Sequence, residues 1–351
     1  MERTVLITGI AGFIGFHCAR RLLRGGWRVV GLDNVNDYYD PALKEARLAL
    51  LREEGGALAV SRLDLADRRG VRALFARERP GVVLHLAAQA GVRHSIDAPH
   101  SYTASNVEGT LVVLEACRRH PVRHLVYASS SSVYGANTDV PFRETDRVDR
   151  PVSLYAATKR ACELMARTYA GLYGVPATGL RFFTVYGPWG RPDMAYWTFT
   201  RKVLAGEAIP LFNGGRMLRD FTHVDDITAA IERLLDLPPE GSSSEPPHRI
   251  LNIGNNRPVE LARFVRAIGR ATGMPVRTRD LPMQPGDVER TSADVTALAA
   301  LTGFRPATAI EDGIADFVDW YRAFHGLPAP GRSGPYAPAA APPAAVTAPG
   351  A

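Results

Sequence analysis

Short apolar runs alternate with longer amphipathic stretches through the first half of the chain. The apolar runs are rich in Val, Leu and Ile and have the length of buried strands; they cover residues 5–7, 27–32, 82–86, 125–128 and 178–183. The longer stretches have apolar residues at helical spacing, and they cover residues 13–24, 106–119 and 153–173. Strands that alternate with helices in this way predict a parallel sheet with helices on its faces.

The pattern changes beyond Gly187, where the alternation loosens and Gly, Pro and aromatic residues become frequent. We therefore expect an α/β fold in which a doubly wound parallel sheet is joined by a smaller α+β domain toward the C-terminus. The expected limits are 1–183 for the sheet domain, with 220–256 returning to it, and 184–219 with 257–325 for the smaller domain. Residues 326–351 contain 9 Ala, 7 Pro and 4 Gly, and we expect them to form a disordered tail.

Composition narrows the class of protein. With 351 residues, 46% of them hydrophobic, the chain can build a full core without disulfides, and its three cysteines have no CxxC spacing. Scattered Lys and Arg give a net charge of +6, which favours an anionic small-molecule ligand over nucleic acid. No apolar run approaches the ~20 residues that cross a bilayer, and Met1 leads within a few residues into a strand-like run. We therefore expect a cytoplasmic protein with no signal peptide and no membrane contact.

A glycine-rich segment follows the first expected strand and opens the first expected helix. Gly9 and Gly12 allow a tight turn that approaches a pyrophosphate, and Gly15 allows close helix–strand packing. Asp33 ends the next strand, where a carboxylate would accept hydrogen bonds from ribose hydroxyls and repel a 2′-phosphate. The alternative, a turn without a ligand, would require turn, helix and acid to coincide by chance. The sequence predicts a Rossmann-type sheet that binds NAD rather than NADP.

Further residues are expected along the same cofactor. Asp64 and Leu65 follow an apolar stretch and could reach the adenine, while small residues near Ala87 would let a flat ring lie close to the backbone. A packing role for Ala87 and Ala88 is nearly as good an explanation. The remaining expected cofactor contacts are Phe13, Ile14, Asn34, Leu86, Gln89, Ser129, Tyr155 and Lys159.

A tyrosine and a lysine stand four residues apart in the expected helix 153–173. Tyr155 and Lys159 therefore share one helix face, and an ammonium group near a phenol favours the phenolate, which is a base. The four serines 129–132 end an earlier strand and could hold a substrate hydroxyl. Alone, such a pair usually marks a solvated helix face. After a dinucleotide-binding pattern and a serine-rich strand end, the pair predicts hydride-transfer chemistry.

These segments resemble the extended short-chain dehydrogenase/reductases, in particular the sugar-nucleotide epimerases. The resemblance runs from about Thr4 to about Tyr321 and is carried by TGIAGFIG (8–15), HLAAQAGVRHS (85–95), YASSSSVYG (127–135), YAATK (155–159), RFFTVYGPWGRPDMA (181–195) and RDFTHVDDI (219–227). Together with LDNVNDYYD (32–40), they look most like UDP-glucuronate 4-epimerases. The resemblance implies resident NAD, Tyr155 as the base, Lys159 beside it, and a sugar that is oxidised at C4, turned and reduced on its other face.

The same resemblance implies roles for further residues. Ser130 falls at the family's catalytic hydroxyl, Ser131 or Ser132 could share that task, and Asn106 falls at a cofactor-side asparagine. Residues expected to bind the UDP part are Arg191, Lys202, Pro210, Phe212, Arg219, Asp287 and Arg290. Arg93 and Thr184 are the candidates for a uronate carboxylate. Homodimers are common in the family, and we expect one here.

Several alternatives remain open at this stage. A 4-keto uronate is a β-keto acid that can lose CO₂, so a UDP-glucuronate decarboxylase is one rival, and a neutral UDP-hexose 4-epimerase is another. A 4,6-dehydratase is disfavoured because residues 130–133 contain no carboxylate. A regulatory NAD(H)-binding module is disfavoured because Tyr155 and Lys159 are both present. No metal is expected, although His223, Asp225 and Asp226 are close in sequence.

Overall fold

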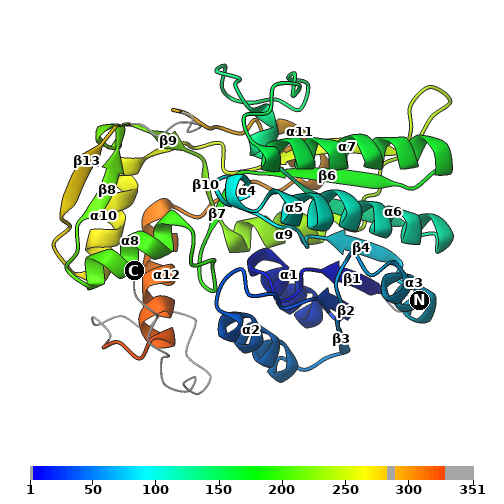
Figure 1. Cartoon of the computed structure of the whole chain (residues 1–351), viewed down its shortest axis with the longest axis horizontal. Helices are drawn as coiled ribbons and strands as arrows, with labels where there is room; N and C mark the ends of the chain where they lie inside the picture. The colour runs from blue at the N-terminus through cyan, green and yellow to red at the C-terminus, as the bar shows by residue number, and fades with distance from the viewer. Residues whose placement is uncertain (1–2, 283–288, 329–351) are drawn as a thin grey trace.

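A seven-stranded parallel sheet is the centre of the computed structural model, which describes residues 3–282 and 289–328 (Figure 1). In spatial order its strands are β11 (His248–Ile253), β6 (Ala177–Phe182), β5 (His124–Ser130), β4 (Val82–His85), β1 (Thr4–Thr8), β2 (Arg28–Asp33) and β3 (Leu58–Arg62). Strand order reverses direction between β1 and β4, which is the point where a doubly wound sheet opens a ligand crevice. The predicted fold class is confirmed.

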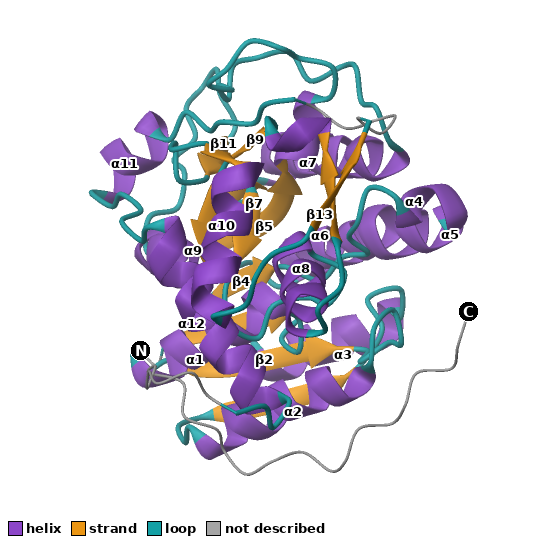
Figure 2. Cartoon of the chain, turned by 90° about the vertical axis from the view of Figure 1, so that its left-hand side faces the viewer, coloured by secondary structure: helices purple, strands orange, loops and turns teal. Residues whose placement is uncertain are grey.

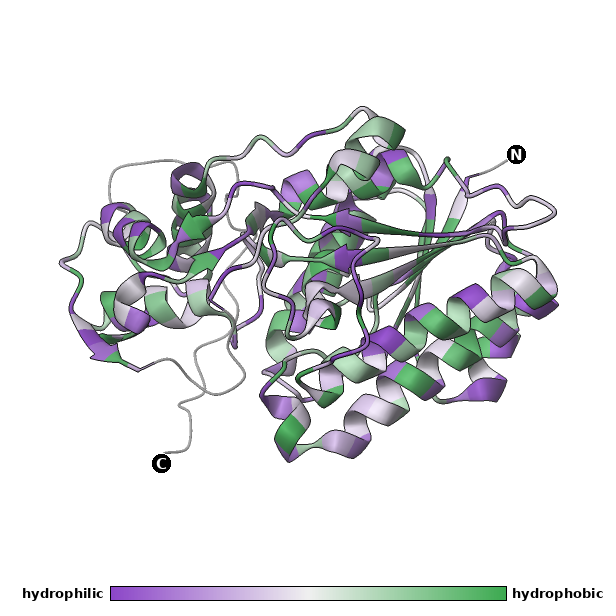
Figure 3. Ribbon diagram, turned by 90° about the horizontal axis from the view of Figure 1, so that it is seen from above, coloured by the Kyte–Doolittle hydropathy of each residue, from purple (hydrophilic) through white to green (hydrophobic). Residues whose placement is uncertain are grey.

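Both faces of the sheet are covered by helices, as Figure 3 shows from above. Along β1, Val5 and Ile7 enter one core while Leu6 enters the other, as the two-residue period of a strand requires. The first core is shared with α1 (Phe13–Arg24), α2 (Pro41–Glu53), α9 (Val224–Leu234) and α11 (Thr296–Thr302). The second is shared with α3 (Arg68–Glu78), α6 (Gly109–Arg119) and α7 (Leu154–Tyr173).

The region between β4 and α6 differs from the single helix expected from residue 106. Two short helices, α4 (His94–Asp97) and α5 (Pro99–Tyr102), lead into a π-helical turn over Thr103–Glu108, and only then does α6 begin. The Asn106 side chain bonds both the N–H and the C=O of Gln89, at 2.8 and 3.0 Å. The π-helical turn therefore carries Asn106, the residue that holds the backbone of Gln89 in the segment after β4.

A smaller unit stands beside the sheet, at the left of Figure 1 and facing the viewer in Figure 2. It contains α8 (Ala195–Leu204), α10 (Leu261–Thr272), α12 (Ile310–Phe324) and the parallel pair β8 (Ile209–Phe212) and β13 (Thr278–Leu281). Its core is rich in aromatic rings, among them Trp197, Phe264, Phe317 and Trp320. Two short pairs complete the connections: β7 (Thr184–Tyr186) with β10 (Phe221–His223), and β9 (Leu218–Arg219) with β12 (Val259–Glu260).

The chain crosses between the two units more than once. After β6 it enters the smaller unit, returns through α9 to place β11 beside β6, and leaves again into α10. Segments distant in sequence are thereby brought to one junction. Among the described residues, no helix combines the length and apolar character needed to span a bilayer.

Candidate active site

A cavity of about 800 Å³ opens at the carboxyl ends of the strands, between the sheet and the smaller unit. Most of the residues predicted from the sequence line it: Gly9, Gly12, Phe13, Ile14, Gly15, Asp33, Asn34, Asp64, Leu65, Leu86, Ala87, Ala88, Gln89, Arg93, Ser129, Ser130, Ser132, Tyr155, Lys159, Thr184, Arg191 and Arg219. The cofactor-side and sugar-side predictions therefore meet in one space. This is the position at which open α/β sheets bind ligands.

The glycine-rich turn has the shape that a dinucleotide needs. Gly9 has a φ of +75°, and a Cβ there would lie 2.8 Å from the backbone nitrogen of Ala87. A Cβ on Gly15 would collide with the carbonyl oxygen of Gly9. Helix α1 begins after Gly12 with no side-chain cap and no acidic residue in its first turn. Its N–H groups and positive dipole end therefore suit a pyrophosphate, and the turn fits NAD.

Asp33 closes the other side of this turn. Its buried carboxylate accepts hydrogen bonds from the N–H groups of Ala11, at 3.0 Å, and Val35, at 2.8 Å. Asn34 beside it donates to Asp64 at 2.7 Å. Each carboxylate oxygen of Asp33 keeps a second lone pair, as a ribose diol requires.

Tyr155 and Lys159 lie in the first turns of α7, whose N-terminus is capped by the Ser153 hydroxyl bonded to the N–H of Ala156. Lys159 is 4% exposed, and its ammonium donates to the carbonyl oxygen of Ala128 at 2.9 Å. The Tyr155 ring meets the edge of the Tyr102 ring with centroids 6.0 Å apart. Burial, with a smaller contribution from Lys159, lowers the pKa of neighbouring His85 to about 3. His85 is therefore uncharged at neutral pH and adds no second positive charge near Lys159.

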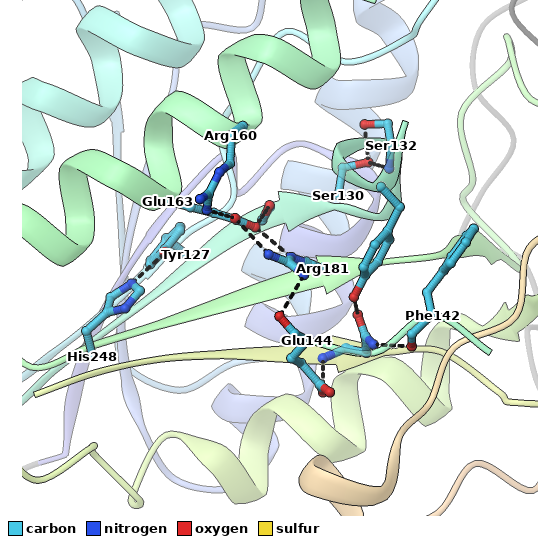
Figure 4. A network of polar contacts seen from close by, with 12 residues as sticks. Tyr127, Ser130, Ser132, Phe142, Glu144, Arg160, Glu163, Arg181 and His248 are labelled. Atoms are coloured by element: carbon cyan, nitrogen blue, oxygen red, sulfur yellow. Dashed lines mark hydrogen bonds and ion pairs between the residues drawn. The ribbon is translucent and has the colours of Figure 1, made fainter. Parts of the chain in front are cut away.

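At the serine-rich end of β5, the hydroxyl of Ser130 has defined hydrogen-bond partners. The Oγ atom of Ser130 accepts hydrogen bonds from the Ser132 N–H at 3.2 Å and the Ser132 hydroxyl at 2.9 Å (Figure 4). Because these two contacts use its lone pairs, the Ser130 proton is left available for donation to another acceptor. Ser132 thus orients Ser130 in addition to lining the cavity itself.

An ion pair on the smaller unit was not anticipated from the sequence. Arg191 donates to Asp193 through Nε at 3.0 Å and Nη2 at 2.5 Å, and the Tyr38 hydroxyl donates to the same carboxylate at 3.4 Å. Asp193 holds the guanidinium plane of Arg191 in one orientation at the cavity. The only sequence signal was the place of Tyr38 shortly after Asp33, since nothing local relates Tyr38 to Asp193.

Some predicted site residues do not line the cavity. Asn106 stands behind Gln89, and Lys202 pairs with Glu207 at 3.0 Å. Pro210 and Phe212 lie in β8, which pairs with β13. The backbone of Arg290 forms an isolated β-bridge with the backbone of Leu218. Asp287 lies outside the described residues. The predicted UDP-binding roles of Lys202, Pro210, Phe212, Asp287 and Arg290 stay predictions. Within the part of the chain that the structure describes, no cluster of three or more His, Cys, Asp or Glu residues could hold a metal ion.

Comparison with known proteins decides the family. A model of the NAD dependent epimerase/dehydratase family matches residues 5–254, which contain the glycine-rich turn, the serines and the Tyr155–Lys159 pair. The chain belongs to this family. NAD as cofactor and NAD-dependent epimerase as enzyme class, both predicted from the sequence, are confirmed at this level.

Individual members of the epimerase/dehydratase family are similar over nearly the whole chain. A probable UDP-glucuronate 4-epimerase of Rhizobium meliloti is 48% identical over 328 residues, covering 90% of this chain and 96% of the relative. The structure of a UDP-glucuronic acid 4-epimerase from Bacillus cereus, with UDP-glucuronic acid and NAD, superposes with a TM-score of 0.82 at 28% identity, covering 91% of this chain and 99% of that one. A UDP-glucose 4-epimerase from Thermotoga maritima, solved with UDP-glucose, gives 0.80 at 28% identity, covering 91% and 98%.

Proposed function

We propose that this protein is a UDP-glucuronate 4-epimerase, which interconverts UDP-glucuronate and UDP-galacturonate through a 4-keto intermediate while NAD stays bound. The observation that carries the proposal is the meeting of Tyr155 and Lys159 with the glycine-rich turn in one cavity, which Arg93 and Thr184 also line. The 48% identity to a probable UDP-glucuronate 4-epimerase supports the choice of sugar.

The chain's own groups can carry the proton transfers of such a reaction. When bound, NAD supplies an acceptor and donor of the C4 hydride. Tyr155, as phenolate, removes the proton of the sugar 4-hydroxyl, and Lys159 stabilises the phenolate by its charge. The Ser130 hydroxyl, whose two lone pairs are used by Ser132, donates its proton to the sugar oxygen and holds it against Tyr155. Rotation of the 4-keto sugar then exposes its other face, and Tyr155 returns the proton.

We assign recognition of the uronate to two further residues that line the same cavity. Arg93 carries a charge that suits a C6 carboxylate, and the hydroxyl of Thr184 could donate to the same group. Arg191 and Arg219 would bind the diphosphate, with Asp193 keeping Arg191 in place. Holding the carboxylate out of line with the C4 carbonyl would also suppress loss of CO₂ from the β-keto acid.

Nuclear magnetic resonance of UDP-glucuronate incubated with purified protein, without added NAD, tests the proposal. UDP-galacturonate with no pentose product is the expected result, and a Tyr155→Phe variant should form less than about 1% as much, since general base catalysis contributes ~10²–10⁴-fold. A UDP-pentose product would establish a decarboxylase instead. Turnover of UDP-glucose but not UDP-glucuronate, even with added NAD⁺, would establish a neutral hexose epimerase.

The carboxylate assignment has its own test. An Arg93→Leu variant should lose UDP-glucuronate turnover by roughly 10- to 100-fold, as expected for removal of a charge-assisted hydrogen bond, and keep its affinity for UDP-glucose. Equal losses with both sugars would reject Arg93 as the carboxylate ligand. The expected cytoplasmic location and homodimer stay predictions.

A further inference from the structure

A buried ion pair lies directly beneath the serine-rich strand end and outside the cavity lining. The side chains of Glu163, on α7, and Arg181, on β6, are only 1% and 2% exposed. Arg181 donates to Glu163 through Nε at 2.8 Å and Nη2 at 3.0 Å, and Figure 4 shows the two groups facing each other between helix and sheet. A buried pair of full charges needs further hydrogen bonds to offset its desolvation.

The Glu163 carboxylate receives those further bonds from two directions. The Ser129 hydroxyl donates to Oε1 at 2.7 Å, and Arg160 donates to Oε2 at 2.9 Å. Four donor groups thus converge on the Glu163 carboxylate. A carboxylate can accept all four hydrogen bonds, because both of its oxygens are acceptors. Burial alone would raise the pKa of Glu163, but the Arg181 and Ser129 hydrogen bonds hold that pKa below its ordinary value. The residue is therefore ionised at neutral pH.

The partners of Glu163 are neighbours in the sheet. Ser129 of β5 and Arg181 of β6 are paired in register, and the next pair is Ser130 with Phe182. One turn earlier on α7, Lys159 donates to Ala128, the residue before Ser129. Helix α7 is thus bonded to two successive residues of β5, one turn of helix apart.

We propose that Glu163 is a positioning residue: it fixes the axial register of α7 against β5 and β6, so that Tyr155 and Ser130 face the same reacting carbon. The inference rests on the catalytic roles proposed above for those two residues. Glu163 does not line the cavity, so it acts through Ser129 and the helix. Without it, the side-chain bond that remains between α7 and β5 among the described residues is that of Lys159 to Ala128, while Thr158 and Cys162 bond α7 to Asn106 rather than to the strand.

The rest of the network extends the same restraint. Arg181 lies over the ring of Tyr134, 4.9 Å from its centroid, and donates to the carbonyl oxygen of Glu144 at 3.3 Å. The Tyr134 hydroxyl donates to Asn252 of β11 at 2.6 Å. The segment after the serines is therefore held by β6 and β11 together.

Three variants and one control test the proposal. Glu163→Gln keeps the shape but puts a donor where an acceptor is needed, and Glu163→Asp keeps the charge but cannot reach Ser129 and Arg181 together. The paired variant Glu163→Leu with Arg181→Met removes both charges and restores an apolar fit. Glu115→Gln is the control, because Glu115, on α6, also holds α7: it accepts a hydrogen bond from the Tyr169 hydroxyl at 2.8 Å, at a place away from the cavity.

In Glu163→Gln and Glu163→Asp we expect kcat to fall roughly 10- to 100-fold, the size of effect that a misplacement of about 1 Å produces. The KM and the bound NAD content of these variants should change little. The paired variant should regain the melting temperature of the parent protein but not its kcat, and Glu115→Gln should keep its kcat. Glu163→Asp supplies the kinetics if Glu163→Gln does not fold.

A kcat that recovers together with the melting temperature, or an unchanged kcat in folded Glu163→Asp, would overturn the proposal and leave a purely stabilising ion pair. All proteins are assayed with both UDP-glucuronate and UDP-glucose. The parent protein's choice between them tests the proposed function, whereas the ratio of variant to parent on the better substrate tests Glu163.

Discussion

The carboxylate of Asp33 accepts a hydrogen bond of 3.0 Å from the N–H of Ala11, so the end of β2 is tied to the glycine-rich turn. An Asp33→Ser variant should bind NAD roughly 10- to 100-fold more weakly, because hydrogen bonds to a charged group contribute ~1.5–3 kcal/mol each. It should also discriminate less against NADP, since the charge that repels a 2′-phosphate is gone. Titration of the cofactor-free protein measures both. Asp37→Ser, in the exposed part of the same loop, is the control and should change neither affinity.

A methyl group at Gly15 has no room, whereas one at Gly171 does. Gly15→Ala should lower the free energy of unfolding by about 1–3 kcal/mol through overpacking against Gly9, and the purified protein should contain less NAD. Gly171→Ala, inside α7 with its nearest neighbour at 3.9 Å, should raise the free energy of unfolding by about 0.5–1 kcal/mol and leave NAD content unchanged. Denaturant titration and cofactor content of the two variants check this contrast.

The fork geometry of Arg191 should matter more than its charge. Arg191→Lys keeps a cation but loses the bidentate contact with Asp193, so the KM for the UDP-sugar should rise roughly 10-fold while kcat changes little. Arg201→Lys, on the exposed side of α8, is the matched control. A KM equal to that of the parent protein in Arg191→Lys would mean that this guanidinium does not contact the diphosphate.

Buried histidines should make the fold sensitive to mild acid. Burial lowers the pKa of His85 to about 3 and the pKa values of His17 and His124 to about 4, from an ordinary value of 6.5. These groups stay neutral in the folded protein, while the unfolded chain protonates them below about pH 6.5. Their contribution to stability is therefore complete above pH 6.5 and is lost as the pH falls toward 4, by up to ~1.4 kcal/mol per pH unit for each residue.

Denaturant unfolding at several pH values between 7 and 5 measures this slope. If each of the three histidines takes up one proton on unfolding, each supplies about one third of their joint contribution to the slope. His85→Gln should therefore remove about one third of that contribution. The exposed His100→Gln should leave it unchanged. A slope that His85→Gln does not alter would show that His85 titrates alike in both states.

The parts of the site that are local in sequence could be predicted from it. The spacing of Gly9, Gly12 and Gly15 predicts a tight turn. Tyr155 and Lys159 are four residues apart, so they are predicted to share one helix face. Both features line the cavity. The fold class could be predicted for the same reason, because the spacing of apolar residues within each strand or helix indicates its type.

Contacts between distant segments could not be predicted in this way. Arg47 donates to the carbonyl oxygens of Ala11 and Gly190, which joins α2 to the cofactor turn and to the smaller unit. Nothing near Arg47 in the sequence indicates either partner. The pairing of Glu163 with Arg181 likewise depends on how α7 lies over β6, which no spacing within one element records.

The place of β11 has a consequence for how the protein is made. Its partner β6 is buried along all six residues, yet β11 is translated only after α8, β8 and α9. A nascent chain that has emerged only as far as α9 therefore presents β6 as an unpaired edge strand, the kind of strand that recruits other chains. Between the synthesis of residue 182 and that of residue 253, the growing polypeptide has a period of exposure to aggregation that ends when β11 docks.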